Sequence, residues 1–564
     1  MLSKIKLGQV LVEHKVITPE QLAKALEEQK KTGELLGVTL QRLGFIDEES
    51  LYMPLLSQQL GVELVHLKER KISPKAIGKI PAKFASHYKV MPVDYQNEIL
   101  TVAMTKPLDI HVIDEISLVI DGKLTPVLAS EKDILEAIRK YYGVGADTIE
   151  RMMSHALPSP GPESEIKDIE EIDSDATISK FLNQILLEAY KDRATDVHIE
   201  PFEDELKIRY RVDGVLYDAK VPSNIKHFKD SINSRIKILS NLNIAEKRMP
   251  QDGRFKVRAG EVDLDLRVSF LPTSYGESAV LRILNSTRLF DFQELGLSLE
   301  EQSKLDDLIK RPHGIIFMTG PTGSGKTTTL YSCLARINTV DKKIVTIEDP
   351  IEYQLKGITQ IQINPRIGLT FSNGLRSMLR HDPDIMMVGE VRDIETAEIA
   401  IRVALTGHMV FSTLHTNDAA SSVTRLLDMG VEPYLISSSL ECVIAQRLVR
   451  VLCPKCKKAT KIRPEIIKDF DCDLPGTADL DIFEEGGCPA CQYTGFIGRK
   501  AIFEFLVFDD AIREMVLGRA TAGQIKEKAK RLGMKTLRQD GWEKVKKGMT
   551  TAREVIRVTE EVKS

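Results

Sequence analysis

The chain has 564 residues, of which 42% are hydrophobic and 28% charged, and its formal net charge is −4. This composition is ordinary for a globular protein, and the length predicts about three or four domains. A protein that grips nucleic acid through phosphates usually carries a clear basic excess, so the charge balance argues against that class. The N-terminal residues lack the apolar core of a secretory signal, and no run of about 18 apolar residues occurs anywhere, so we expect a cytoplasmic protein without a transmembrane helix.

The N-terminal region contains an internal repeat, at 6–58, with an offset of 29 residues. The repeated positions are a Leu-Gly pair, a leucine and a terminal glutamine, which fall at Leu7, Gly8, Leu11 and Gln29 and again at Leu36, Gly37, Leu40 and Gln58. Leucines at helical spacing indicate by themselves only the core of a small helical bundle. The matched Leu-Gly and Gln pairs are harder to explain as core.

Composition shifts mark the domain boundaries. Residues 61–142 are mixed, with a strand expected at 100–104 and a helix at 133–142. Residues 157–162 hold three prolines and 163–175 are mostly acidic, so this stretch indicates a linker rather than an ordered acidic loop. We therefore expect an N-terminal regulatory module at 1–142, an acidic, Pro-rich linker at 143–176, a second domain at 177–298 and a third at 299–564.

The second domain has one amphipathic helix, at 178–189, followed by strand patterns. Alternating apolar residues predict strands at 206–212 and 262–269, and Asp213-Gly214 is typical of a turn. Arginines recur in this domain, at Arg209, Arg211, Arg254, Arg267 and Arg282.

The third domain opens with a phosphate-binding motif. An apolar run at 315–318 leads directly into GPTGSGKT, and a helical pattern follows at 328–337. Strand, glycine-rich loop and helix is the context in which backbone N–H groups and a helix N-terminus surround phosphates. Lys326 is expected to reach the β- and γ-phosphates, and the Thr327 hydroxyl to ligate Mg²⁺. The predicted ATP-binding residues are Gly320, Pro321, Thr322, Gly323, Ser324, Gly325, Lys326, Thr327 and Thr328.

Hydrolysis needs carboxylates near the metal and the attacking water. Two further strand-like runs end in acidic residues: 344–347 is followed by Glu348 and Glu352, and 385–388 by Glu390. Such strand ends converge at the carboxyl edge of a sheet, although spacing alone does not say which carboxylate has which role. His408 and His415 flank the next apolar run, and they are either ordinary structural histidines or a phosphate sensor.

Four of the seven cysteines form two CxxC pairs, Cys453/Cys456 and Cys488/Cys491. Two such knuckles complete a tetrahedral set of four thiolates, which predicts a structural zinc site in an insertion at 453–491. An iron–sulfur cluster or two redox-active dithiols are the alternatives.

These motifs occur in an order that resembles a known family. The P-loop, TIEDPIEY at 346–353, DPDIMMVGEVRD at 382–393, TGHMVFSTLHTN at 406–417 and the paired CxxC resemble the secretion ATPase superfamily of type IV pilus and type II secretion motors. The likeness extends over nearly the whole chain and is most specific over 190–500. It implies an α/β fold with a RecA-like P-loop domain, a PAS-like α+β domain before it and a mainly helical N-terminal module, assembled into a hexameric ring.

The resemblance also assigns roles. It implies that Glu352 is the catalytic glutamate, that Glu390 is the Walker B carboxylate near Mg²⁺, and that His408 and His415 form the family's histidine box. ATP would lie between the second domain and the P-loop domain. Some of four arginines would then neutralise phosphate charge, namely Arg211, Arg254, Arg267 and Arg282.

The repeat at 6–58 resembles the cyclic-di-GMP-binding N-terminal module of this superfamily. The implied contacts are Lys6, Leu7, Gly8, Leu11, Gln29, Leu36, Gly37, Leu40 and Gln58. The pattern departs from the family at Lys6 and Leu35, where arginine is usual, and at Lys15, where glycine is usual. Leu35 lacks a guanidinium that would stack on a base or pair with phosphate.

The resemblance implies a cytoplasmic motor at the inner-membrane face that powers type IV pilus assembly. Its partners would be five further copies of itself, an inner-membrane platform protein that it rotates and the cytoplasmic ring proteins of the pilus machine, with no direct membrane contact and no nucleic acid. The alternative within the family is a type II secretion ATPase. Outside it stand a nucleic-acid translocase and a non-enzymatic sensor of cyclic dinucleotides.

Overall fold

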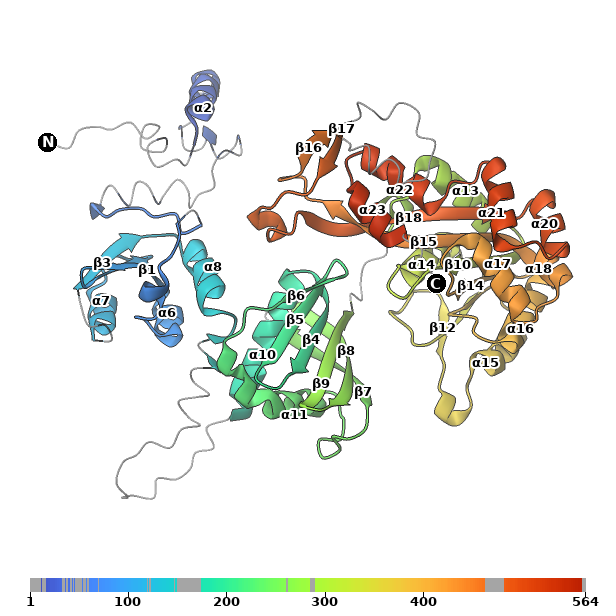
Figure 1. Ribbon diagram of the computed structural model, residues 1–564, viewed down its shortest axis with the longest axis horizontal. Coiled ribbons are helices and arrows are strands. Elements are labelled where there is room, and N and C mark those ends of the chain that lie inside the picture. The colour runs from blue at the N-terminus through green and yellow to red at the C-terminus, as the bar shows by residue number, and fades with distance from the viewer. Residues whose placement is uncertain are drawn as a thin grey trace. The chain divides into compact units, whose positions relative to one another are not determined.

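The structure, a computed structural model, divides into two compact units, Met1–Ile283 and Leu284–Ser564, and each is described by itself (Figure 1). The described residues are 12, 17–32, 36, 39–40, 43, 45, 53, 57, 60–68, 70–118, 120, 123–146, 148–149, 174–259, 262–284, 290–461 and 481–559. No helix within these ranges is long and apolar enough to cross a membrane.

The described part of the N-terminal repeat contains one long helix, α2 (Pro19–Thr32). Its start is capped reciprocally, because Gln21 N–H donates to Thr18 Oγ1 over 3.2 Å and Thr18 N–H donates to Gln21 Oε1 over 2.9 Å. Ile17, Ala25 and Leu40 form its small buried core. The expected helical character is confirmed for this segment.

A three-stranded sheet follows, in the order β1-β2-β3. Its strands β1 (Val90–Gln96) and β2 (Ile99–Met104) are antiparallel, whereas β2 and β3 (Lys123–Leu128) are parallel. The helices around it are α5 (Pro74–Ile77), α6 (Ala82–Tyr88), α7 (Ile110–Ser117) and α8 (Glu131–Tyr142). The strand expected at 100–104 and the helix expected at 133–142 are both present.

The second sheet has six strands in the order β6-β5-β4-β9-β8-β7. The strands are β4 (Ala194–Pro201), β5 (Leu206–Val212), β6 (Val215–Asp218), β7 (Gln251–Ala259), β8 (Val262–Thr273) and β9 (Gly276–Leu284). Alternate residues of these strands are buried against the helices α10 (Ser174–Lys191) and α11 (Lys229–Leu239), as their period of two requires. Val144 and Ile149 of the expected linker also belong to this core.

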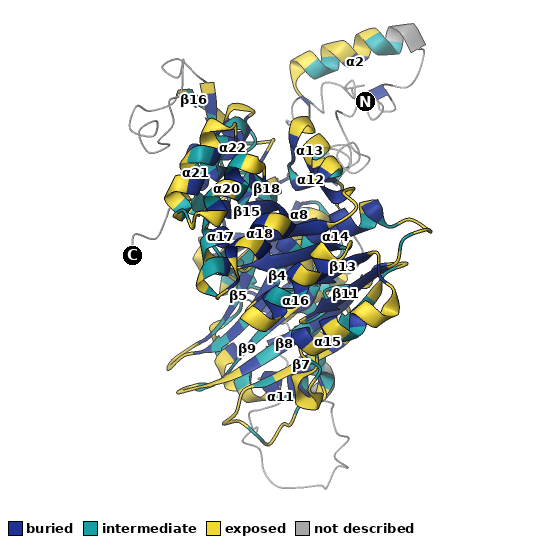
Figure 2. Cartoon of the chain, turned by 90° about the vertical axis from the view of Figure 1, so that its right-hand side faces the viewer, coloured by how far each residue is buried: buried dark blue, intermediate teal, exposed yellow. Residues whose placement is uncertain are grey.

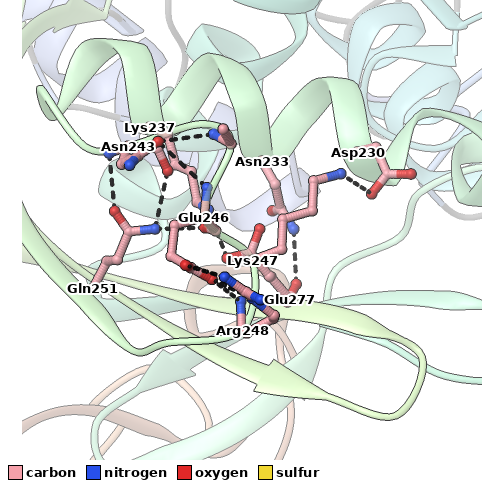
Figure 3. Close-up of polar contacts among 10 residues, drawn as sticks. Asp230, Asn233, Lys237, Asn243, Glu246, Lys247, Arg248, Gln251 and Glu277 are labelled. Carbon is pink, nitrogen blue, oxygen red and sulfur yellow. Dashed lines mark hydrogen bonds and ion pairs between the residues drawn. The ribbon is translucent and has the colours of Figure 1, made fainter.

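The buried Lys237 side chain ties α11 to β9 by an ion pair and to the loop that enters β7 by a hydrogen bond (Figure 3). Lys237, 1% exposed, places its Nζ atom 2.6 Å from Oε1 of Glu277 on β9 and donates to the carbonyl of Glu246 over 2.8 Å. Breaking such a pair would leave a buried charge without compensation, so its partners hold one another in place. Gln251 closes the same loop by donating to the carbonyl oxygens of Asn243 and Glu246. The strand that carries Arg254 therefore starts from a fixed position.

The second unit is built on a seven-stranded sheet, in the order β12-β11-β13-β14-β10-β15-β18. All neighbouring strands are parallel except β15 and β18, which are antiparallel. The strands are β10 (Gly314–Thr319), β11 (Ile344–Glu348), β12 (Thr359–Gln362), β13 (Ile385–Val388), β14 (Met409–Leu414), β15 (Leu440–Leu452) and β18 (Phe496–Val507). The three strands expected from the sequence near the P-loop are confirmed.

Helices cover both faces of this sheet, which buries its central strands completely (Figure 2). One core involves α12 (Phe292–Leu295), α13 (Leu299–Ile309) and α14 (Lys326–Ile337). The other involves α15 (Phe371–Met378), α16 (Ile394–Leu405), α17 (Ala419–Asp428), α18 (Pro433–Ser439), α20 (Asp510–Leu517), α21 (Ala522–Arg531), α22 (Leu537–Lys546) and α23 (Ala552–Thr559). Because Phe292, Leu295 and Leu297 pack in the first core, the unit begins before the boundary expected at 298–299.

The C-terminal helix α23 is anchored to β15 by Glu554, which is 2% exposed. Burial opposes ionisation of this carboxyl, but hydrogen bonds from Arg557 and Arg450 outweigh it and lower the pKa of Glu554 to about 2. The folded-state pKa therefore lies below the unfolded value. The resulting stability is fully present above the unfolded pKa of about 4.5 and is lost as the pH falls from there towards 2.

We expect Glu554→Gln to lower the free energy of unfolding of the second unit by roughly 2–3 kcal/mol at pH 7. Urea unfolding of the variant and the unchanged chain, at pH 7 and near pH 3, measures the difference, which should shrink at the lower pH. Glu543→Gln is the matched control, because this partly exposed carboxylate pairs with Lys546 on the surface of α22 and should change stability by less than about 0.5 kcal/mol. An equal loss at both pH values would contradict the assignment.

Candidate functional site

The P-loop lies between β10 and α14, as the motif requires. Gly325, at the start of α14, has a φ of 87°, and a Cβ atom there would lie 2.9 Å from the side-chain nitrogen of Gln446. At Gly320 a Cβ atom would lie 2.6 Å from the carbonyl oxygen of Gln446. The loop therefore needs glycine at both positions, because its backbone passes close to β15 and bends where side chains are strained.

Two residues of β15 contribute here, and sequence reasoning missed both: Gln446 braces the P-loop, and Arg447 joins β15 to the loop after β14. The buried amide of Gln446 donates to Ser324 O and accepts from Thr329 Oγ1, each over 2.9 Å. The mostly buried Arg447 donates to Gln446 O and to Asn417 O, over 3.0 and 2.7 Å. No motif signals these residues, because only the placement of β15 beside β10 brings them to the loop.

Lys326 is buried and its ammonium faces the loop itself. It donates to Gly320 O over 2.6 Å and to Pro321 O over 3.1 Å. Burial, together with the nearby Arg447 charge, lowers the pKa of Lys326 to about 8, and Glu390 partly opposes this change. A phosphate group would offer this ammonium charged acceptors, which form stronger bonds than carbonyl oxygens.

The acidic strand ends lie at the same edge of the sheet as the P-loop, since β10, β11, β13 and β14 are parallel. Glu390 follows β13, and its two carboxylate oxygens lie 2.6 Å from Arg392 Nη2 and 3.2 Å from His415 Nε2. Because it also acts on the pKa of Lys326, Glu390 belongs to the P-loop's surroundings.

The remaining two carboxylates differ in environment. Glu348, at the end of β11, is 2% exposed, and its carboxylate accepts hydrogen bonds from neighbouring side chains. Glu352, in the loop that follows, is half-buried. This contrast favours Glu352 over Glu348 for contact with a water molecule, a choice that the sequence spacing left open.

The structure separates the two histidines. His415, after β14, lies beside Glu390. His408, before β14, accepts a hydrogen bond on its carbonyl from Gly314 N–H at the start of β10, and its Nδ1 atom lies 3.2 Å from Val403 O. Because these strands are parallel, His408 lies at the edge of the sheet opposite the P-loop, and only His415 is brought together with the acidic residues.

The four arginines expected to meet phosphate lie in the first unit, on two carboxylate centres of the six-stranded sheet. Asp196 on β4 stands opposite Arg211 on β5 and Arg282 on β9, and Arg282 Nε lies 2.9 Å from its carboxylate. Asp265 on β8 accepts two hydrogen bonds from Arg254 on β7, over 2.8 and 2.7 Å.

Directly opposite residues of neighbouring strands share one face of a sheet. Each of the two carboxylates therefore lies on the same face of the sheet as the arginines that it orients. Arg267 on β8 stands opposite Arg254 in the same way. The hydrogen bonds from Arg254 hold the pKa of Asp265 below its ordinary value, which keeps that carboxylate charged.

The four cysteines of the two CxxC pairs come together in space. The antiparallel pairing of β15 with β18 brings the knuckle after Leu452 next to the one before Phe496. The four Sγ atoms lie within 4.8 Å of one another, and Cys453–Cys488, Cys456–Cys491 and Cys488–Cys491 are each separated by 3.7 Å.

These separations fit a single ion. Four thiolates about 2.3 Å from a tetrahedral zinc ion lie about 3.8 Å apart. Backbone N–H groups of Cys488 and Gly495 donate to the sulfur of Cys491 and, against the effect of burial, hold the pKa of this thiol at about 7. The donor set therefore suits a metal ion that binds thiolate. The described part of the insertion also contains the hairpin β16 (Lys458–Lys461) and β17 (Asp481–Glu484).

The repeat at 6–58 is described only in part. Gln29 lies on α2, Leu36 is half-buried and Leu40 is fully buried against Ala25. Leu40 thus contributes to a core, which its leucine spacing alone also indicates. The other implied contacts lie outside the described residues: Lys6, Leu7, Gly8, Leu11, Gly37 and Gln58.

Comparison with known proteins gives concordant results. Residues 171–557 match the family described as "Type II/IV secretion system protein", and residues 60–148 match the MshEN domain, which places that match after the repeat at 6–58. The chain is 42% identical over 562 residues to the type IV pilus assembly ATPase PilB of Myxococcus xanthus (strain DK1622), covering 98% of both chains. It is 40% identical over 565 residues to the type II secretion system protein E of Xanthomonas campestris pv. campestris, covering 99% of both.

A solved structure has the same fold. The ATPase DotB of Yersinia pseudotuberculosis is 20% identical and aligns with a TM-score of 0.50 over 72% of this chain and 98% of its own. The P-loop geometry, the acidic strand ends and these relatives lead to one conclusion: the chain belongs to the type II/IV secretion system protein family and is an ATPase with a RecA-like P-loop domain.

Proposed function

We propose that this ATPase powers type IV pilus assembly by converting ATP hydrolysis into rotation of an inner-membrane platform protein. The observation that carries the proposal is the 42% identity to a pilus assembly ATPase over 98% of the chain. The second candidate is the type II secretion motor, which the 40% identity over 99% of the chain favours. Both place the protein at the cytoplasmic face of the inner membrane, in contact with the membrane only through its partners.

Deletion of the gene separates the two functions. The pilus proposal predicts loss of surface pili with normal release of secreted proteins, and recovery of pili when the unchanged gene is supplied. Normal pili together with lost protein secretion would instead establish the second candidate.

We further propose roles for the residues at the carboxyl edge of the β10 sheet. Lys326 binds the β- and γ-phosphates, and the backbone of residues 320–328 surrounds them. Glu352 orients and polarises the attacking water. Thr327 and Glu390 supply oxygen ligands of the kind that Mg²⁺ prefers, and the ion would neutralise phosphate charge there. His415 holds Glu390 in position, a role that its 3.2 Å contact supports.

For the first unit we propose that Arg211, Arg254, Arg267 and Arg282 supply positive charge to bound ATP within a homohexameric ring. Their support is the pair of acidic centres, since Asp196 and Asp265 hold guanidinium groups in defined directions. Closing of the arginine-bearing sheet on the nucleotide would then be the mechanical stroke.

We propose zinc as the metal of the four-cysteine cluster. The 3.7 Å sulfur separations support a single ion, because a cluster of several irons holds its ligands further apart. Metal analysis of purified protein should give about one zinc per chain, and Cys488→Ser should lose it. Since Cys333 is buried on α14, remote in sequence from the cluster, Cys333→Ser is the control that should retain the metal. Zinc far below one per chain, or iron in its place, would contradict the assignment.

The N-terminal module is proposed to bind cyclic-di-GMP, which the MshEN match at 60–148 and the neighbouring repeat support. Calorimetry with cyclic-di-GMP should show binding to the full chain, and the repeat predicts that Gly37→Asp abolishes it. Unchanged binding in that variant would mean that the cyclic-di-GMP site lies outside the repeat.

A further inference from the structure

A buried polar network connects the P-loop helix α14 with the loop that carries Glu352. Its centre is Tyr331 on α14, whose side chain is fully buried. The Tyr331 hydroxyl donates to the Glu348 carboxylate and accepts a hydrogen bond from the backbone N–H of Glu352, over 3.3 Å. One hydroxyl thus joins the helix that starts at Lys326 to the backbone of the proposed catalytic residue.

Gln360 on β12 holds the same loop from its other end. Its amide nitrogen donates to the Tyr353 carbonyl oxygen over 3.1 Å, and its amide oxygen accepts from Leu355 N–H over 2.7 Å. Tyr331 and Gln360 together therefore bind three backbone groups of the loop. An edge-to-face contact between the rings of Tyr331 and Tyr353, 4.7 Å between centroids, packs the loop on the helix.

Glu348 fixes both of these side chains. Its carboxylate accepts from Tyr331, from Gln360 Nε2 over 3.1 Å and from Thr346 Oγ1 over 2.6 Å. All three donors are neutral groups, and a buried carboxylate that loses such donors carries a large desolvation cost. Burial and the charge of Glu348 raise the pKa of the Tyr331 hydroxyl, which keeps it protonated and able to donate.

We propose that Tyr331 is a positioning residue for ATP hydrolysis, which sets the place of Glu352 relative to the P-loop through the backbone of the loop that carries it. This inference rests on the proposed role of Glu352. The physical reason is that the phosphates would be bound at the N-terminal end of α14. Because Tyr331 also belongs to α14, a loop bonded to Tyr331 holds Glu352 at a constant distance from those phosphates. Gln360 supports the same loop, and Glu348 orients both residues.

Tyr331→Phe tests the proposal, because it removes only the hydroxyl. We expect kcat to fall roughly 10- to 100-fold, with KM for ATP and the affinity for a non-hydrolysable ATP analogue unchanged. Ser439→Ala is the matched control. It also removes one buried hydroxyl from the second unit, but that hydroxyl donates to the Leu435 carbonyl within α18 and lies outside the network around Glu348, so kcat should stay unchanged.

Several outcomes would overturn the proposal: full activity of Tyr331→Phe, equal losses of kcat in both variants, or parallel changes in kcat and analogue affinity. If Tyr331→Phe does not fold, Gln360→Met takes its place, and it should lower kcat with KM unchanged. Unchanged kcat there would overturn the proposal too.

The role of Glu352 is tested separately with Glu352→Gln, alone and combined with Tyr331→Phe. Since Tyr331 acts through Glu352, the double variant should be no slower than Glu352→Gln alone. Full turnover by Glu352→Gln would remove the premise that Glu352 is catalytic. An inactive Glu352→Gln beside a fully active Tyr331→Phe would overturn the positioning role only.

Discussion

Replacing Lys326 by alanine should reduce ATP turnover by roughly 1,000-fold or more. In the proposed role this ammonium binds the β- and γ-phosphates, and it is already buried within the loop, 2.6 Å from Gly320 O. Alanine removes the only long cationic side chain of the GPTGSGKT segment. Phosphate release from ATP by the purified variant measures the effect, with circular dichroism to show that the fold is kept.

Lys310→Ala is the control for this experiment. Lys310 is an exposed lysine at the C-terminal end of α13 in the same unit, so its loss changes the net charge equally and should leave turnover unchanged. Full activity of Lys326→Ala would show that the loop does not act as a P-loop, against its geometry and its motif.

Glu352→Gln should abolish hydrolysis and leave ATP binding intact, with a loss of turnover of roughly 100- to 10,000-fold. Glutamine keeps the size of the side chain and the backbone bond to Tyr331, but it cannot accept a proton from water. A fluorescent ATP analogue measures binding, and single-turnover hydrolysis isolates the chemical step.

Glu395→Gln provides the comparison, because this exposed carboxylate on α16 pairs with Arg376 and should have no effect on turnover. If Glu352→Gln keeps its activity while Glu390→Gln loses it, the catalytic role moves to Glu390. Loss of nucleotide affinity in Glu352→Gln would mean that the carboxylate acts in binding instead.

Much of the site could be predicted, because most of its candidate functional residues lie close together within short segments of the sequence. The P-loop needs glycines, a lysine and a threonine at fixed spacing between a strand and a helix, and all lie within residues 315–337. The strands near it are runs of apolar residues because both faces of the sheet are buried. Each CxxC pair is likewise a short local turn that the sequence reveals by itself. The two pairs together supply the four cysteines that a tetrahedral metal site requires.

The sequence was less informative where two residues of the same type look equivalent in the sequence but lie in different structural environments. His408 and His415 flank the same strand and look equivalent, yet a strand of six residues carries them to opposite edges of the sheet. Glu348 and Glu352 are neighbours in one motif, yet the first turns into the protein. Direction along the strand and the side to which a residue points decide their roles.

By itself the sequence indicated the family, and it predicted the nucleotide site and the four cysteines that come together in space, since each depends on spacing within a few residues. Only the tertiary structure decided that Gln446 braces the P-loop, that Tyr331 joins α14 to the loop of Glu352, and that Asp196 and Asp265 orient the arginines. The contacts of Gln446 with Ser324 and of Arg282 with Asp196 join residues that lie far apart along the chain. They follow from the order of strands in a sheet, in which β15 is placed beside β10, and strand order is settled by packing of the whole domain rather than by any local pattern.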